Sequence, residues 1–230
     1  MSADKVAMAF PFSTPPSLVI FDCDGVLVDT ETLANQLLVK VLAEDGFEIS
    51  YEDCRRLFVG KTLEAVMAHV EAAIGRPLAP QWPEHVRDET LKAFSGGINA
   101  VPDVREVLVA LKAKGVPYCV ASSGKFEKMR FTLGSSDLLP LVADVLFSAE
   151  QVGRGKPWPD LFLFAAKSMG FAPAECVVIE DSVPGVEAAV AAGMSVLGYA
   201  GDPHTDADAL KAKGAHVFYD MNALIGLLGF

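Results

Sequence analysis

Short apolar runs alternate with amphipathic stretches along most of the chain. Runs of three to five apolar residues, rich in β-branched and aromatic types, are typical of strands buried in a parallel sheet. The amphipathic stretches repeat apolar residues every three or four positions, which predicts helices with one buried face. We therefore expect strands at residues 18–21, 117–121, 145–147, 176–179, 195–197 and 216–218, with helices at residues 103–114, 125–133, 160–169 and 183–192 and at the C-terminus. This alternation predicts an α/β fold with a doubly wound, Rossmann-like parallel sheet and right-handed crossovers.

Residues 30–100 interrupt this alternation, because they carry helical patterns and no convincing strand. Four helices are expected there, at residues 31–45, 51–58, 63–74 and 83–94. The pattern indicates an all-helical cap domain inserted into the α/β chain. We therefore predict a core of residues 18–29 and 101–230, a cap of residues 30–100, and a flexible leader of residues 1–17. The leader does not resemble a signal peptide, since its short apolar stretch is broken by prolines.

Composition narrows the choice of partners. The formal net charge of −11 argues against a nucleic-acid partner, and no apolar run is long enough to predict a membrane span. The four cysteines show no metal-binding spacing, and three lie in or beside predicted strands, where a free thiol packs as a small apolar group. We expect a cytoplasmic protein with reduced cysteines, a monomer or a weak homodimer.

Acidic residues follow two of the predicted strands. Asp22-Cys23-Asp24-Gly25 comes directly after residues 18–21, and Glu180-Asp181 comes after residues 176–179. The carboxyl ends of parallel strands form the edge at which such sheets bind ligands. If strand geometry persists through residue 24, Asp22 and Asp24 project to the same side. Asp-x-Asp-Gly alone equally fits a solvated turn, but the second acidic pair favours a functional site.

Four segments together resemble a known family. Asp22-Cys-Asp24-Gly-Val-Leu-Val-Asp29 resembles the first motif of the haloacid dehalogenase-like hydrolases, Asp-x-Asp-Gly-x-Leu-x-Asp. Ser122 after an apolar run, Lys156 opening Lys-Pro-Trp-Pro-Asp, and Glu180-Asp181-Ser182 follow in the family's order. The resemblance is greatest to the branch that holds sugar-phosphate phosphatases and β-phosphoglucomutase.

The resemblance implies a role for each motif residue. It makes Asp22 the nucleophile that takes up the phosphoryl group and Asp24 the general acid and base, with Ser122 and Lys156 contacting phosphoryl oxygens.

A metal ion is also expected. Four carboxylates at one sheet edge cannot all stay ionised without a cation, and hard oxygen ligands favour Mg²⁺ over zinc. In the family, the ion is held by the residues equivalent to Asp22, the Asp24 carbonyl and Asp181. Glu180 is either a further ligand or a hydrogen-bond acceptor behind the ligands.

Other candidates would bind the substrate. Ser123, Gly124 and Lys125 lie at a strand-to-helix turn, where helix N-terminal amides suit anions, although Lys125 could equally be solvated. In the cap, Lys61 stands at the position of the family's specificity loop, and Arg87 is a second candidate. Polar loops and amphipathic helices carry such cations routinely, so both could equally be ordinary surface residues.

The function predicted from these motifs is Mg²⁺-dependent hydrolysis of small phosphorylated sugars or sugar acids through an aspartyl-phosphate. The acid at Asp24 disfavours dehalogenation, because a halide leaves without protonation. A β-phosphoglucomutase-type reaction is the alternative. The family's mutases carry Arg in the cap loop, however, and the ammonium of Lys61 is less suited than a guanidinium to donate two hydrogen bonds to one phosphate. A phosphoacceptor receiver module is a more distant alternative, opposed by the cap and by the place of Asp22 after the first strand.

Overall fold

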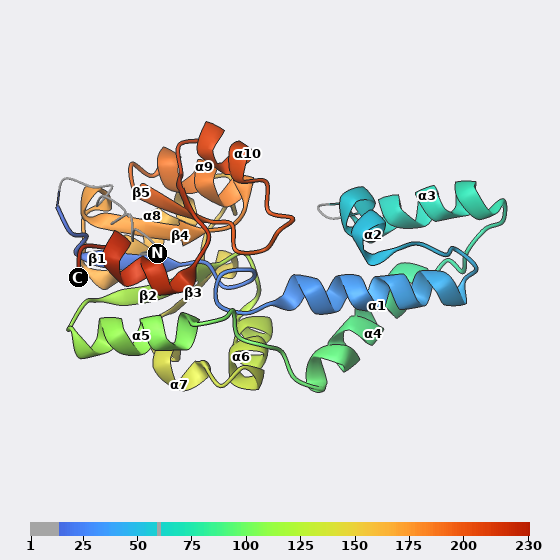
Figure 1. Ribbon diagram of the computed structural model, residues 1–230, viewed down its shortest axis with the longest axis horizontal. Helices are drawn as coiled ribbons and strands as arrows, with labels where there is room; N and C mark the ends of the chain where they lie inside the picture. The colour runs from blue at the N-terminus through green and yellow to red at the C-terminus, as the bar shows by residue number, and fades with distance from the viewer. Residues whose placement is uncertain (1–13, 59–60) are drawn as a thin grey trace, which may run out of the picture. The chain divides into compact units, whose positions relative to one another are not determined.

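The computed structural model describes residues 14–58 and 61–230, and the chain divides into two compact units. The first unit joins the chain up to Val28 to Ala100–Phe230, and the second is Asp29–Asn99 (Figure 1). The predicted core and cap have boundaries within a residue of these. Most of the predicted leader, residues 1–13, lies outside the described residues.

The first unit is built on a parallel sheet of six strands within the described residues. The strands are β1 (Leu18–Phe21), β2 (Tyr118–Ser122), β3 (Leu146–Ser148), β4 (Cys176–Glu180), β5 (Ser195–Tyr199) and β6 (His216–Phe218). Their order is β3-β2-β1-β4-β5-β6, so β1 is central. Phe21, the last residue of β1, pairs with Val120 of β2 and Ile179 of β4. The segments that follow β1, β2 and β4 therefore start at neighbouring points on one sheet edge.

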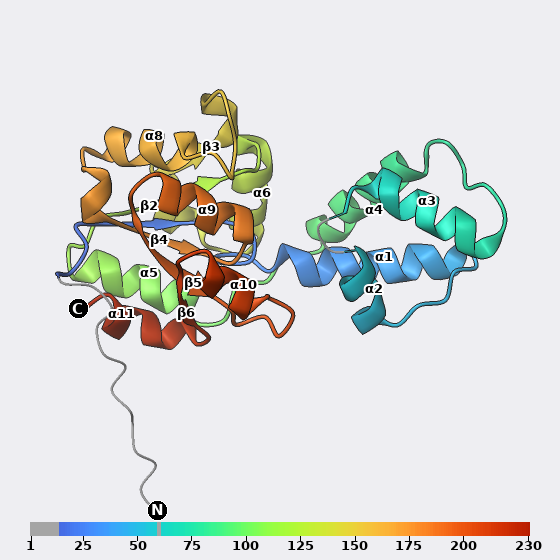
Figure 2. The same ribbon diagram turned by 90° about the horizontal axis from the view of Figure 1, so that it is seen from above.

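Helices cover both faces of this sheet, as Figures 1 and 2 show. On one face lie α5 (Val104–Ala113), α6 (Phe126–Ser135) and α7 (Leu139–Val142), with α11 (Leu224–Leu227) packed against α5. On the other lie α8 (Asp160–Met169), α9 (Val183–Ala191) and α10 (Ala207–Ala212). Leu18, Ile20 and Val178 of the strands and Ala165 of α8 are fully buried in the core of this second face. The predicted doubly wound α/β fold is confirmed.

The second unit is helical in its described residues. It contains α1 (Thr30–Glu44), α2 (Tyr51–Phe58), α3 (Leu63–Ile74) and α4 (Trp82–Ser95), which share an apolar core of their own. Asp29 and Thr62 cap α1 and α3 by accepting the backbone N–H groups of Thr32 and Ala65 at 3.1 and 3.3 Å. Capping side chains of this kind satisfy amides that have no partner within the helix.

The differences from the predicted elements are local. Strand β2 includes Ser122 and β4 includes Glu180, so both residues are held by the sheet rather than by loops. Helices α7 and α10 have four and six residues, too few for a helical repeat to be recognised in the sequence. Within the described part of the chain, no helix has the length and apolar character needed to cross a membrane.

Candidate active site

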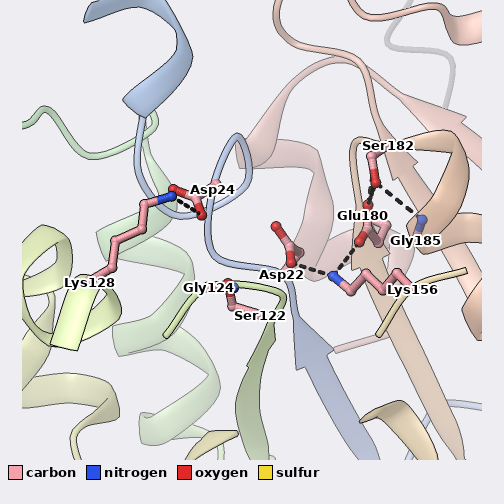
Figure 3. Close-up of polar contacts among 9 residues, drawn as sticks. All are labelled: Asp22, Asp24, Ser122, Gly124, Lys128, Lys156, Glu180, Ser182 and Gly185. Atoms are coloured by element: carbon pink, nitrogen blue, oxygen red, sulfur yellow. Dashed lines mark hydrogen bonds and ion pairs between the residues drawn. The ribbon is translucent and has the colours of Figure 1, made fainter. Parts of the chain in front are cut away.

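The loop after β1 turns back on itself immediately beyond the strand. Leu27 N and Val28 N donate to the Cys23 carbonyl at 2.9 and 3.0 Å, and Gly25 N donates to the Val28 carbonyl at 2.8 Å. Gly25 has φ +82, a conformation that side-chain-bearing residues rarely adopt. Strand geometry therefore ends at Phe21, and the alternation considered for Asp22 and Asp24 does not apply. Their carboxylates contact different lysines (Figure 3).

Asp22 and Glu180 share the ammonium of Lys156. Lys156 Nζ donates to Asp22 Oδ1 and, at 2.6 Å, to Glu180 Oε1. All three side chains are almost completely buried: Lys156 is 6% exposed, Asp22 is 10% exposed and Glu180 is 1% exposed. Burial raises the pKa of Asp22 to about 7; Lys156 opposes this rise, while the Glu180 and Asp24 carboxylates add to it. A buried carboxylate of this kind needs adjacent cations if it is to stay ionised at neutral pH.

Glu180 is engaged by the protein through both oxygens. Its Oε2 accepts from Ser182 N and Ser182 Oγ, each at 2.8 Å, while Oε1 accepts from Lys156. Ser182 also caps α9 by accepting Gly185 N at 3.2 Å, and the carboxyl of Glu180 lies where a Cβ on Gly185 would be. In this arrangement Glu180 orients Lys156. Of the two roles left open for Glu180, the geometry favours that of a hydrogen-bond acceptor.

Asp181 lies against the loop that follows β1. Its Oδ2 occupies the space where a Cβ on Gly25 would be, so only glycine there allows this approach. Within the described residues, no three His, Cys, Asp or Glu side chains are grouped as a metal site. Mg²⁺ does not require such a group, because one or two carboxylates with water and substrate phosphate suffice. The hard oxygens of Asp22 and Asp181, with the Asp24 carbonyl, fit that ion.

Ser122 and Gly124 form one hydrogen-bonded turn at the end of β2. Ser122 is buried, and its Oγ accepts Gly124 N at 3.0 Å. Ser148 of β3, also buried, donates to the Gly124 carbonyl at 2.7 Å. Phe126 N in the first turn of α6 donates to Glu150 Oε2 at 3.0 Å. The amide of the candidate Gly124 and that of the neighbouring Phe126 thus both have partners within the chain.

The remaining candidates are exposed. Ser123 and Lys125 lie at the surface beside Gly124. In the second unit, exposed Lys61 lies over Phe58, with Nζ 6.0 Å from the ring centroid, and Arg87 donates to Glu64 Oε1 at 2.8 Å. The substrate-binding roles of these residues stay predictions.

Lys128 was not among the residues singled out from the sequence. From the first turn of α6 its Nζ donates to Asp24 Oδ2 at 2.8 Å, across 104 residues of chain (Figure 3). The sequence signal was weak, because a lysine on an amphipathic helix is usually solvated. The one indication of a role in the site was its position six residues after Ser122, in a helix that starts beside the site.

Comparison with known proteins shows to which family the chain belongs. Residues 16–193 match the model of the haloacid dehalogenase-like hydrolases. The chain is 35% identical over 187 residues to a 6-phosphogluconate phosphatase of Escherichia coli (strain K12), covering 81% of this chain and 83% of that protein.

Two crystal structures are also similar over nearly their whole length. One is a HAD family hydrolase from Deinococcus radiodurans R1 with bound phosphate and sodium, 34% identical, with a TM-score of 0.86 and coverage of 94% of this chain and 97% of that one. The other is a putative β-phosphoglucomutase from Thermotoga maritima, 30% identical, with a TM-score of 0.79 and coverage of 92% and 98%.

The chain belongs to the haloacid dehalogenase-like hydrolase family. Within it, the protein falls in the branch of sugar-phosphate phosphatases and β-phosphoglucomutase-like proteins, as predicted. The prediction of a phosphatase of this family is likewise confirmed. The receiver-module alternative is not supported.

Proposed function

We propose that the protein is a Mg²⁺-dependent phosphatase that hydrolyses small phosphorylated sugars or sugar acids through a phosphoryl intermediate on Asp22. The observation that carries this proposal is the buried carboxylate of Asp22 at the carboxyl edge of the central strand, in contact with Lys156. A buried carboxylate is shielded from water, and the positive charges of Lys156 and of a bound Mg²⁺ together would favour the ionised form that a nucleophile needs.

The first half of the reaction transfers the phosphoryl group to the protein. An oxygen of Asp22 forms a bond to phosphorus while the bond from phosphorus to the sugar oxygen breaks. Asp24 gives a proton to that leaving oxygen. Lys156 and the Ser122 hydroxyl face the charge on the phosphoryl oxygens, the main requirement of phosphoryl transfer.

The second half returns the site to its starting state. A water oxygen attacks phosphorus, Asp24 takes the proton from that water, and the bond between Asp22 and phosphorus breaks to release inorganic phosphate. Asp22, Asp181 and the Asp24 carbonyl would hold Mg²⁺, which supplies positive charge that stabilises the transferring group. The close approach of Asp181 to Gly25 supports this ligand set.

The substrate class rests on the relatives and on the second unit. The relative that acts on 6-phosphogluconate supports a phosphorylated sugar or sugar acid here. We assign Asp29–Asn99 as the cap that selects the substrate, with Lys61 and Arg87 as its candidate anion-binding residues. The four cysteines are free thiols, which supports a reducing compartment such as the cytoplasm. We infer a monomer or a weak homodimer.

The proposal is tested by product analysis with purified protein. With Mg²⁺, we expect release of inorganic phosphate from 6-phosphogluconate or related sugar phosphates, lost with EDTA and lost in Asp22→Asn. Incubation with β-glucose 1-phosphate and a bisphosphate primer tests the mutase alternative. Formation of glucose 6-phosphate without free phosphate would replace hydrolysis by the mutase reaction.

A further inference from the structure

The catalytic loop contains two carboxylates, and each contacts its own lysine. The pair of Asp22 with Lys156 is almost completely buried, whereas Asp24 and Lys128 are 28% and 41% exposed. Figure 3 shows the two pairs on opposite sides of the loop, with the Asp24 carboxylate directed toward Lys128. The proposed reaction gives Lys156 a role, but it leaves the contact between Lys128 and Asp24 unexplained.

Two side chains on one face of α6 contact this loop. Lys128 and Thr132 are four residues apart, so they are neighbours on the helix surface. Lys128 holds the carboxylate of Asp24, and buried Thr132 lies beside the buried thiol of Cys23. Two successive residues of the loop, Cys23 and Asp24, therefore lie against the same helix.

The stem of Lys128 also passes the turn that carries Ser122. A Cβ on Gly124 would lie 3.3 Å from Ser122 Oγ and 3.6 Å from Lys128 Cδ. The stem of Lys128 therefore lies within van der Waals reach of the turn that carries Ser122. Because α6 begins directly after that turn, its helix links the position of Asp24 to the position of Ser122.

We propose that Lys128 is a positioning residue that holds the carboxylate of Asp24 for its two proton transfers. The inference rests on the proposed function, because it adds a residue to the same site. In the first transfer Asp24 gives its proton to the leaving sugar oxygen as the bond from that oxygen to phosphorus breaks. In the second it takes a proton from the water that bonds to phosphorus, while the bond between Asp22 and phosphorus breaks. Proton transfer demands a heavy-atom separation close to that of a hydrogen bond, so a displaced carboxylate loses rate.

The test compares Lys128→Met with Arg130→Met, which removes one positive charge from an exposed position of the same helix. Positioning predicts that Lys128→Met lowers kcat for a sugar phosphate by about tenfold or more, within the range that general acid–base catalysis contributes. KM should stay within about twofold. Arg130→Met should behave like the wild type, and Lys128→Arg should recover part of kcat.

The dependence of the rate on the leaving group distinguishes a positioning role of Lys128 from a merely structural one. 4-Nitrophenolate leaves with little need of a proton, so in Lys128→Met the phosphorylation of Asp22 by 4-nitrophenyl phosphate should keep its rate. Hydrolysis of the phosphoryl intermediate should slow, giving a burst of nitrophenolate. A merely structural lysine would lower both steps together, through the fraction of folded protein. In an Asp24→Asn background, adding Lys128→Met should change the residual rate by less than about twofold, because the two residues act as a unit.

Two outcomes overturn the inference. If kcat is preserved while KM rises about tenfold, Lys128 binds the substrate instead. If Lys128→Met is indistinguishable from the wild type and Arg130→Met, the contact has no role in the reaction. Failure of the proposed function is distinct, because the wild type itself would then hydrolyse no phosphate monoester.

Discussion

Lys156 and Glu180 form a buried ion pair at the carboxyl edge of the sheet, with Lys156 Nζ 2.6 Å from Glu180 Oε1. Strand β4 fixes Glu180, Ser182 holds its other oxygen, and the pair places the ammonium against Asp22. The site is thus organised from the strand behind it.

Removing one partner of this pair should be strongly destabilising. Glu180→Gln leaves Lys156 with Asp22 alone in a buried place, and we expect a loss of about 3–5 kcal/mol in the free energy of unfolding. Urea denaturation followed by circular dichroism measures this loss.

The matched control is the more exposed ion pair of Arg154 and Asp160, in which Arg154 Nη2 lies 2.9 Å from Asp160 Oδ2. Asp160→Asn should cost no more than about 1 kcal/mol. Equal losses for the two substitutions would contradict a buried, organising role of Glu180.

Gly25→Ala should disturb both the fold and the metal dependence of turnover. The new Cβ would meet Asp181 Oδ2, at a residue whose φ is +82. We expect a higher Mg²⁺ concentration for half-maximal activity, as well as a loss of stability.

Gly193→Ala is the control for backbone strain, since Gly193 has φ +74 and open space where its Cβ would be. It should cost about 1–2 kcal/mol through the left-handed backbone alone and leave the Mg²⁺ dependence unchanged. An unchanged Mg²⁺ dependence in Gly25→Ala would remove Asp181 from the ligand set.

The cap residues should differ in their effect on substrate binding. Arg87 donates to Glu64 at the surface of the second unit, so Arg87→Ala removes an exposed pair of little energetic value. Lys61→Ala should raise KM for a sugar-acid phosphate more than Arg87→Ala does, with kcat preserved. Steady-state kinetics with the two variants checks this order, and a larger KM change in Arg87→Ala would reverse the assignment.

The buried thiols predict a dependence on pH. Burial raises the pKa of Cys54 and Cys176 from 9.0 to about 11. The folded state therefore keeps protons that the unfolded state loses near pH 9. The free energy of unfolding should accordingly fall as the pH rises from 9 to 11, and Cys176→Ala should reduce that fall. Ellman's reagent at pH 8 should label the native protein only as fast as it unfolds, and immediate labelling of either thiol would contradict this account.

The sequence could predict those parts of the site that depend on the pattern of strands and on the residues that follow them. Apolar runs followed by acids predicted that Asp22 and Asp181 would lie at one edge of the sheet, and the structure adds that β1 and β4 are paired. Contacts between side chains could not be predicted in this way. Lys128 is joined to Asp24, and Glu150 to Phe126 N, only because helix α6 packs where it does. Nothing local in the sequence distinguishes these side chains from solvated ones.

The central claim is that Asp22 takes up the phosphoryl group, and rapid acid quenching during turnover tests it most directly. Mass spectrometry of the digested protein should find a phosphoryl group on the peptide containing Asp22, formed and lost at rates compatible with turnover, and absent in Asp22→Asn. Steady hydrolysis of a sugar phosphate with no phosphoryl group on that peptide, or with one on another residue, would contradict the account.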